Sequence, residues 1–186
     1  GELKRVVVVG GGLIGLEVAE NLADRGVKTS VIDFAPHVLS EMLDPEMSEY
    51  VENAMANAGI MPFTGVALEG ITGTGKVEKV LTSRRPMKAD AVVLAMGFRP
   101  NTDFLADSGL EMVKGTLLVD EHMQTNDPDI YAAGDCALVT SRITGQRQWS
   151  AMGSTANICG RLAAMHMAGD ENAPAYPGVL GTGIAK

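Results

Sequence analysis

The apolar positions in the first part of the chain alternate between a strand pattern and a helix pattern. Val6 to Val9 form an unbroken run of valines, which predicts a strand over residues 5–9. Residues 13–24 carry apolar side chains at helical spacing, and a second β-branched run follows over residues 28–33. This order predicts a strand, a helix and a parallel strand, so the chain begins with a βαβ unit.

A second helix is expected after this unit. Asp44 and Pro45 are the residue types that open a helix, as the N-cap and as the first-turn proline. Apolar residues then recur at helical spacing until Gly59 ends the pattern. We therefore expect a helix between these signals and a short third strand over residues 60–63.

The pattern of residues 66–87 changes to short alternating segments. Turn residues over 73–76 and 84–86 separate these segments, which predicts antiparallel strands. We expect a β-meander here in place of a crossover helix, followed by a fully buried parallel strand over residues 90–96. The predicted fold class is therefore α/β, with a Rossmann-like three-layer domain that contains a β-meander.

One segment of this meander imitates a different site. GITGTGK, residues 70–76, has the spacing of a phosphate-binding P-loop up to its lysine. Val77 stands where that motif requires Ser or Thr, and the following residues alternate like a strand where a helix N-terminus is needed. We interpret the segment as a glycine-rich hairpin turn.

The C-terminal part of the chain has shorter patterns. A short helical piece ends at Gly109, and strands are predicted over residues 116–119 and 130–133. The second of these strands is expected to end at Gly134. Apolar residues at helical spacing then predict a helix over residues 150–168.

The turn between the first strand and the first helix carries the chemistry of the βαβ unit. Gly10, Gly12 and Gly15 have the spacing GxGxxG, and an acidic residue ends the second strand. The first glycine permits the tight turn, the second lets a pyrophosphate approach the backbone, and the third lets the helix pack on the strand. Free N–H groups at the helix N-terminus favour the anion. We predict a dinucleotide site here that includes Leu13 and Ile14.

Asp33 indicates which dinucleotide binds. A carboxylate at this strand end accepts hydrogen bonds from ribose hydroxyls, whereas a 2′-phosphate at about 4 Å would be repelled by about 4 kcal/mol. Phe34, Ala35 and Pro36 follow without an arginine. We therefore expect NADH rather than NADPH and include Phe34 among the cofactor-binding residues, although His37 leaves NADPH open. The ordinary alternative for Asp33 is a turn aspartate.

The composition limits the class of protein. The 186 residues are 46% hydrophobic, which suits one domain or one domain with part of a second. A formal net charge of -8 disfavours nucleic acid and anionic membranes as partners. There is no apolar run of membrane-spanning length and no signal-peptide pattern. A chain of this length does not need a disulfide framework, so its two cysteines indicate a reducing cytoplasm. Cys136 and Cys159 form no redox or zinc motif, no metal site is expected, and Cys159 is interpreted as buried packing.

Three segments together resemble the FAD-dependent pyridine nucleotide-disulfide oxidoreductases. They are GGGLIGLEVAE at residues 10–20, LAMGFRPNT at residues 94–102 and TNDPDIYAAGDC at residues 125–136. With the ANICGR run at residues 156–161, they are most similar to the NADH oxidase and coenzyme A disulfide reductase branch. The resemblance covers essentially the whole chain and implies NAD, as NADH, and FAD as cofactors.

The resemblance also implies cofactor contacts outside the glycine turn. It implies that Asp135 accepts a hydrogen bond from the ribityl chain of FAD and that Glu17 lies near the nicotinamide carboxamide. Gly97 and Phe98 would form a second close approach to the dinucleotide. An N-cap aspartate, a helix-surface glutamate and a plain turn are the ordinary alternatives. The helix face over residues 157–161 would approach the flavin or a dimer partner, and no residue is assigned a catalytic role.

The chain differs from a complete family member in its extent. A complete member has an FAD-binding unit and a redox cysteine before its NADH domain, and an interface domain at its end. We therefore expect an NADH-binding domain over residues 1–112 and an incomplete, returning part of the FAD-binding domain over residues 113–186. The implied parent is a homodimer that passes hydride from NADH to FAD and on to a disulfide, persulfide or oxygen, and the isolated chain is expected to be inactive. The alternative is a noncatalytic NAD-binding or redox-sensing module.

Overall fold

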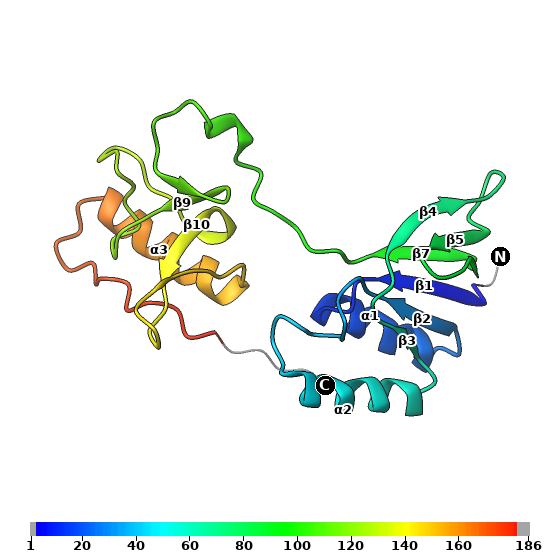
Figure 1. The fold of residues 1–186 in the computed structure, drawn as a ribbon. Helices are drawn as coiled ribbons and strands as arrows, with labels where there is room; N and C mark the ends of the chain where they lie inside the picture. Colours follow the sequence, from blue (N-terminus) through cyan, green and yellow to red (C-terminus); the bar gives the residue numbers. More distant parts are fainter. Residues whose placement is uncertain (1–2, 182–186) are drawn as a thin grey trace. The chain divides into compact units, whose positions relative to one another are not determined.

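The computed structural model describes residues 3–181, which form two compact units over residues 3–97 and 98–181 (Figure 1). Each unit has its own sheet and its own hydrophobic core. None of the helices in residues 3–181 is long and apolar enough to cross a membrane.

The first unit is built on a parallel four-stranded sheet in the order β3-β2-β1-β7. Its strands are β1 (Arg5–Val9), β2 (Lys28–Ile32), β3 (Met61–Phe63) and β7 (Ala91–Leu94). The strand β1 pairs with β2 on one side and with β7 on the other, and its four valines are buried in the two layers that pack on the sheet. The predicted βαβ unit is confirmed.

Two helices cover one face of this sheet. They are α1 (Leu13–Asp24) and α2 (Pro45–Asn57), and their bounds match the predicted helices. Ala19 of α1 and Met55 of α2 join Val6 and Val8 in one buried cluster. Alternate residues of a strand point to opposite faces, so Val6 and Val8 identify the helix-covered face of β1.

The β-meander covers the other face. It is a three-stranded antiparallel sheet of β4 (Leu68–Thr72), β5 (Lys79–Thr82) and β6 (Met87–Lys88). Val80 of β5 packs with Val7 and Val9 of β1 in a second cluster. The three-layer arrangement and the meander are therefore confirmed, and the P-loop-like segment lies in the β4–β5 hairpin as predicted.

The strand β7 is parallel as predicted, but the prediction that it is fully buried is wrong. Leu94 is 55% exposed, and the preceding three residues are only partly buried. The cause is position in the sheet, because β7 is its edge strand among the described residues. An edge strand lacks the second neighbour that would cover it.

The second unit has a mixed four-stranded sheet in the order β11-β10-β9-β8. The strands are β8 (Met112–Val113), β9 (Thr116–Leu118), β10 (Ala137–Thr140) and β11 (Arg147–Trp149). Only the central β9 and β10 pair in parallel, and the outer pairs are antiparallel. The helix α3 (Gly153–Met167) supplies fully buried Cys159 to the core of this unit, so the packing interpretation of Cys159 is confirmed.

Two short 3-10 helices, η1 (Asp103–Leu105) and η2 (Gly134–Cys136), occur in this unit. The prediction of a strand over residues 130–133 that ends at Gly134 is wrong. Tyr131 forms only an isolated bridge with Gln124, and the regular strand β10 begins after η2. Residues 130–133 and the strand β10 are both largely apolar. Their hydrophobic pattern alone therefore does not distinguish a paired strand from a single bridge.

Candidate dinucleotide site

The glycine turn joins the carboxyl end of β1 to α1. Gly10 has a φ of 112°, and its N–H donates to the carbonyl oxygen of Ile32 at 2.8 Å. A Cβ atom at Gly10 would lie 2.1 Å from the carbonyl oxygen of Ala95, and one at Gly15 would lie 1.9 Å from the carbonyl oxygen of Gly10. Both positions therefore require glycine, because no larger residue fits between the two backbones.

The N-terminus of α1 opens directly onto this turn. The first hydrogen bond of the helix runs from the N–H of Leu16 to the carbonyl oxygen of Gly12 at 3.0 Å, so the N–H groups of residues 13–15 precede the helix ladder. A Cβ atom at Gly12 would meet no heavy atom within 4 Å, which leaves space above the turn. Leu13 and Ile14 are 37% and 61% exposed. Open space, free N–H groups and the helix dipole together suit an anion.

Asp33 stands beside this turn, at the end of β2. One carboxylate oxygen accepts a hydrogen bond from the N–H of Gly11 at 2.5 Å, and the other accepts one from the N–H of Ala35 at 2.7 Å. The second bond forms the aspartate turn that was the ordinary alternative. Each oxygen retains a further lone pair for a ligand hydroxyl. Asp33 therefore orders the turn and remains able to hold a ribose.

His37 is engaged with an acidic partner. Its Nδ1 lies 3.3 Å from a carboxylate oxygen of Glu52, and that oxygen also accepts a hydrogen bond from the N–H of Val38 at 3.1 Å. The imidazole of His37, which follows β2, thus lies beside the carboxylate of Glu52.

The remaining predicted residues of the first unit lie around this centre. Phe34 is 82% exposed beside Asp33, and Glu17 is exposed on the second turn of α1. Gly97 follows β7 with a φ of 80°, which is a conformation that favours glycine. Each position is accessible to a ligand, and their cofactor contacts remain proposals.

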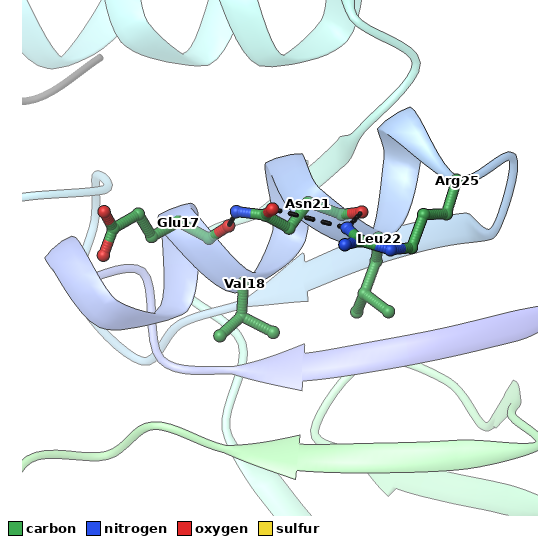
Figure 2. A pocket seen from close by; sticks show the side chains of 5 residues that line it. All are labelled: Glu17, Val18, Asn21, Leu22 and Arg25. Atoms are coloured by element: carbon green, nitrogen blue, oxygen red, sulfur yellow. Dashed lines mark hydrogen bonds between the residues drawn. The ribbon is translucent and has the colours of Figure 1, made fainter.

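A shallow hollow of about 320 Å³ also lies on α1. Figure 2 shows its lining residues along one helix, with the Glu17 carboxylate directed away from the Arg25 end. Side-chain amide and guanidinium groups there bond to backbone carbonyls of the same helix: Asn21 to Glu17 at 2.9 Å and Arg25 to Asn21 at 2.7 Å. The whole lining comes from α1 and its C-cap, and Glu17 is the one predicted cofactor-binding residue in it.

In the second unit, Asp135 and Phe98 are connected through Trp149. The indole Nε1–H of Trp149 donates to the carbonyl oxygen of Asp135 at 2.7 Å, and its ring centroid lies 5.2 Å from that of Phe98. The Asp135 side chain is exposed on η2. Gly134 has a φ of 80° and approaches Ala156 of α3, where a Cβ atom would lie 3.4 Å from the Ala156 Cβ. The Trp149 side chain thus holds the backbone of the Asp135 turn, and the Asp135 carboxylate is accessible.

Polar groups of α3 and of the segments on either side of it form a small network. Ser150 and Thr155 share a hydrogen bond of 3.0 Å between their hydroxyl oxygens. Burial raises the pKa of the Cys159 thiol, and a hydrogen bond with Tyr176 opposes part of that rise. Burial also raises the pKa of Tyr176, with the neighbouring Cys159 as a further cause. Protonated, uncharged Cys159 and Tyr176 suit this structural position.

Sequence reasoning missed two contacts in these sites. Gly11 supplies the N–H that holds Asp33, and a Cβ atom there would lie 3.1 Å from the same carboxylate oxygen. The three consecutive glycines at positions 10–12 are a sequence signal that could have indicated Gly11. Trp149 offered none, because its partner Asp135 becomes a neighbour only through the β10–β11 hairpin.

Comparison with known proteins places this geometry in a family. The family model described as pyridine nucleotide-disulphide oxidoreductase matches residues 1–159. The chain is 40% identical over 183 residues to an NADH oxidase of Methanocaldococcus jannaschii, covering 98% of this chain and 40% of that protein. The chain thus spans well under half the length of this relative.

Solved structures give the same result. An FAD-dependent pyridine nucleotide-disulphide oxidoreductase from Desulfovibrio vulgaris matches with a TM-score of 0.87 and 36% identity, over 97% of this chain and 46% of that one. The NAD-dependent persulfide reductase from A. fulgidus matches with a TM-score of 0.89 and 35% identity, over 99% of this chain and 34% of that one.

A third structure contains a bound dinucleotide. The water-forming NADH oxidase from Lactobacillus brevis, bound to NADH, has a TM-score of 0.86 and 29% identity, over 95% of this chain and 39% of that one. An engineered form of it, described as an NADPH oxidase, is bound to NADPH. From the matched family model, the relatives and the shared fold, the chain belongs to the pyridine nucleotide-disulphide oxidoreductase family.

Proposed function

We propose that this chain is the NADH-binding part of a flavoprotein oxidoreductase that passes hydride from NADH to FAD and on to a disulfide, persulfide or oxygen. The observation that carries the proposal is the Asp33 carboxylate, held by two backbone N–H groups beside the open N-terminus of α1. The proposed division is an NADH-binding domain over residues 1–112 and a returning part of the FAD-binding domain over residues 113–186.

The first unit fits NADH from the phosphates to the ribose. The N–H groups of Leu13, Ile14 and Gly15 would hold the pyrophosphate above Gly12, and Asp33 would accept hydrogen bonds from the adenosine ribose. Phe34 would lie at the adenosine end and Glu17 near the nicotinamide carboxamide, and Gly97 with Phe98 would form a second close approach to the dinucleotide. The roles of Glu17, Gly97 and Phe98 follow from the family resemblance.

The preference for NADH over NADPH rests on charge. The Asp33 carboxylate at the end of β2 would repel a 2′-phosphate, and His37 already has Glu52 as a partner. In the engineered relative bound to NADPH, the named substitutions remove an aspartate and introduce arginine at the next position. They also change a glycine that precedes that aspartate by as many residues as Gly15 precedes Asp33.

The second unit offers part of an FAD site. The exposed Asp135 carboxylate on η2 would accept a hydrogen bond from the ribityl chain, and Trp149 and Phe98 would keep that turn in place. The flavin would supply the hydride-accepting chemistry. The face of α3 that carries Asn157 and Arg161 is exposed and would contact either flavin or a second subunit.

The names of the relatives favour an enzyme over the noncatalytic module. They include NADH oxidases and persulfide reductases. By the same resemblance we propose a homodimeric, cytoplasmic parent protein whose NADH-oxidising activity requires more of the flavin site than this chain contributes.

The test compares two aspartates that bind backbone N–H groups. Asp33→Ala is expected to weaken NADH binding, measured by calorimetry, by about 10- to 150-fold, because a hydrogen bond to a charged group contributes about 1.5 to 3 kcal/mol. Asp90 is the matched control, since its carboxylate accepts bonds from Lys4 and Arg5 at the other end of β1. Asp90→Ala should leave NADH affinity unchanged. Unchanged NADH affinity in Asp33→Ala, or tighter binding of NADPH than NADH by the unaltered chain, would overturn the proposal.

A further inference from the structure

Two of the three histidines in the sequence meet in the second unit. His122 lies in the segment after β9, and His166 lies in the last turn of α3. The Nδ1 of His122 is 3.1 Å from the Nε2 of His166, and the ring centroids are 4.3 Å apart with planes inclined at 67°. The residues are separated by 44 positions, so no sequence motif joins them.

We propose that His122 and His166 form a binding site for a divalent transition metal ion, such as Zn²⁺ or Ni²⁺. Neutral imidazole nitrogen is a preferred ligand for these ions. Tetrahedral zinc with bonds of about 2.0 to 2.1 Å places two ligand nitrogens about 3.3 to 3.4 Å apart. The observed 3.1 Å separation is within a few tenths of an ångström of that value, so small ring movements admit the ion.

A third donor and the helix end support the same position. The carbonyl oxygen of Pro174 lies 3.4 Å from the Nε2 of His166, a separation that also suits two ligands of one ion. His166 is in the last turn of α3, where the helix dipole favours positive charge. In residues 3–181 no group of three or more His, Cys, Asp or Glu side chains could hold an ion, so the proposed site has two imidazoles and one carbonyl oxygen as its protein ligands and would need water for the rest.

The backbone around His122 is already ordered. One carboxylate oxygen of Asp120 accepts hydrogen bonds from the N–H groups of His122 at 2.8 Å and Gln124 at 2.9 Å. The N–H of Tyr176 donates to the carbonyl oxygen of Glu121 at 2.7 Å, which fixes the segment that follows α3. Ordered ligands lose less entropy when the ion binds, and the ion would join the segment after β9 to the end of α3.

The test is calorimetric titration of the full chain with Zn²⁺ alone, in a Cys136→Ser background that removes the partly exposed thiol. One Zn²⁺ per chain is expected. His122→Gln and His166→Gln should each weaken binding by more than about tenfold, since even changes to outer-shell partners cost about 10- to 100-fold. His37→Gln is the matched control, because His37 pairs with Glu52 in the other unit. Equal Zn²⁺ binding by the variants and the parent chain would overturn the proposal.

A second measurement needs no substitution of the pair. Ni²⁺ is added to the unaltered chain while the imidazole signals are followed by NMR. The His122 and His166 signals should broaden together, at lower Ni²⁺ concentration than the His37 signal. Simultaneous broadening of all three signals, or loss of only the His37 signal, would show that the pair is a plain hydrogen bond between rings.

Discussion

The two units fix their candidate cofactor residues in different ways. In the first unit the backbone makes the site, since glycines bring β1, α1 and Ala95 together and N–H groups hold Asp33. In the second unit side chains make it, since Trp149 bonds the backbone of Asp135 and packs against Phe98. The difference implies that the first site fails when a Cβ atom is added at Gly10 or Gly15, whereas the contacts of Trp149 in the second can be weakened in steps.

The largest expected effect comes from Gly10→Ala. The new Cβ atom would meet the Ala95 carbonyl, and we expect a loss of about 1 to 3 kcal/mol from overpacking and about 1 to 3 kcal/mol from the positive φ. Denaturant unfolding of the first unit measures this loss. Gly12→Ala is the control, because its Cβ atom meets open space and its cost as an N-cap is under about 1 kcal/mol. It should fold normally and still bind NADH more weakly, whereas equal unfolding of both variants would refute the backbone argument.

The next effect concerns the choice of cofactor. The double change Asp33→Ala with Phe34→Arg should raise the ratio of NADPH to NADH affinity by about 10- to 150-fold, as a bond to a charged group contributes about 1.5 to 3 kcal/mol. Fluorescence titration with both dinucleotides measures the ratio. Phe34→Arg alone is the control and should leave NADH preferred, because Asp33 still repels the 2′-phosphate. A single Phe34→Arg change that inverted the preference would show that Asp33 does not determine it.

A smaller effect is expected in the second unit. Trp149→Phe keeps the aromatic contact with Phe98 and loses the hydrogen bond to Asp135, at a cost of about 0.5 to 1.5 kcal/mol. Trp149→Ala should cost about 0.5 to 1.5 kcal/mol more through the lost aromatic pair. Faster hydrogen exchange in residues 134–136 would accompany both variants. NADH affinity should stay constant in Trp149→Phe, which retains the contact with Phe98, and a large loss of it would show that the hydrogen bond to Asp135 also supports NADH binding.

The smallest effect is a change of stability with pH. Burial raises the pKa of Cys159 above its ordinary value of 9.0, so the folded second unit retains a proton that the unfolded chain releases. The stabilisation that the protonated Cys159 thiol gives the folded unit is therefore complete below pH 9.0. It is lost as the pH rises through the pKa of the thiol in the folded state. Thermal unfolding across this range should show a falling midpoint. Cys159→Ala should give a shallower decline, and an identical slope would rule Cys159 out as the cause.

The sequence predicted the elements of the first unit better than those of the second. The valine run, the glycine turn and the signals around α2 act locally, so β1, α1 and α2 have their expected bounds. The position of β7 at the sheet edge depends on the other strands, and its partial exposure had no local signal. The segment 130–133 is as apolar as the strand β10, but it forms only an isolated bridge because β10 occupies the place beside β9.

The same limit applies to the candidate sites. Asp33 was identified because a strand, a turn and an acid follow one another along the chain. The bond between Trp149 and Asp135 and the meeting of His122 with His166 required the fold, since their partners are distant in sequence. Residues that act through neighbours in space leave no periodic signal.

Trp149 also makes the Asp135 turn observable by its own emission. It is the sole tryptophan in the sequence, and its Nε1–H is bonded to the turn on which the ribityl contact is proposed. Indole fluorescence depends on that bond and on the polarity around the ring, so the emission of the whole chain reports one known position. Flavin binding beside Asp135 would quench it, which gives an unlabelled optical signal for assembly of the flavin site.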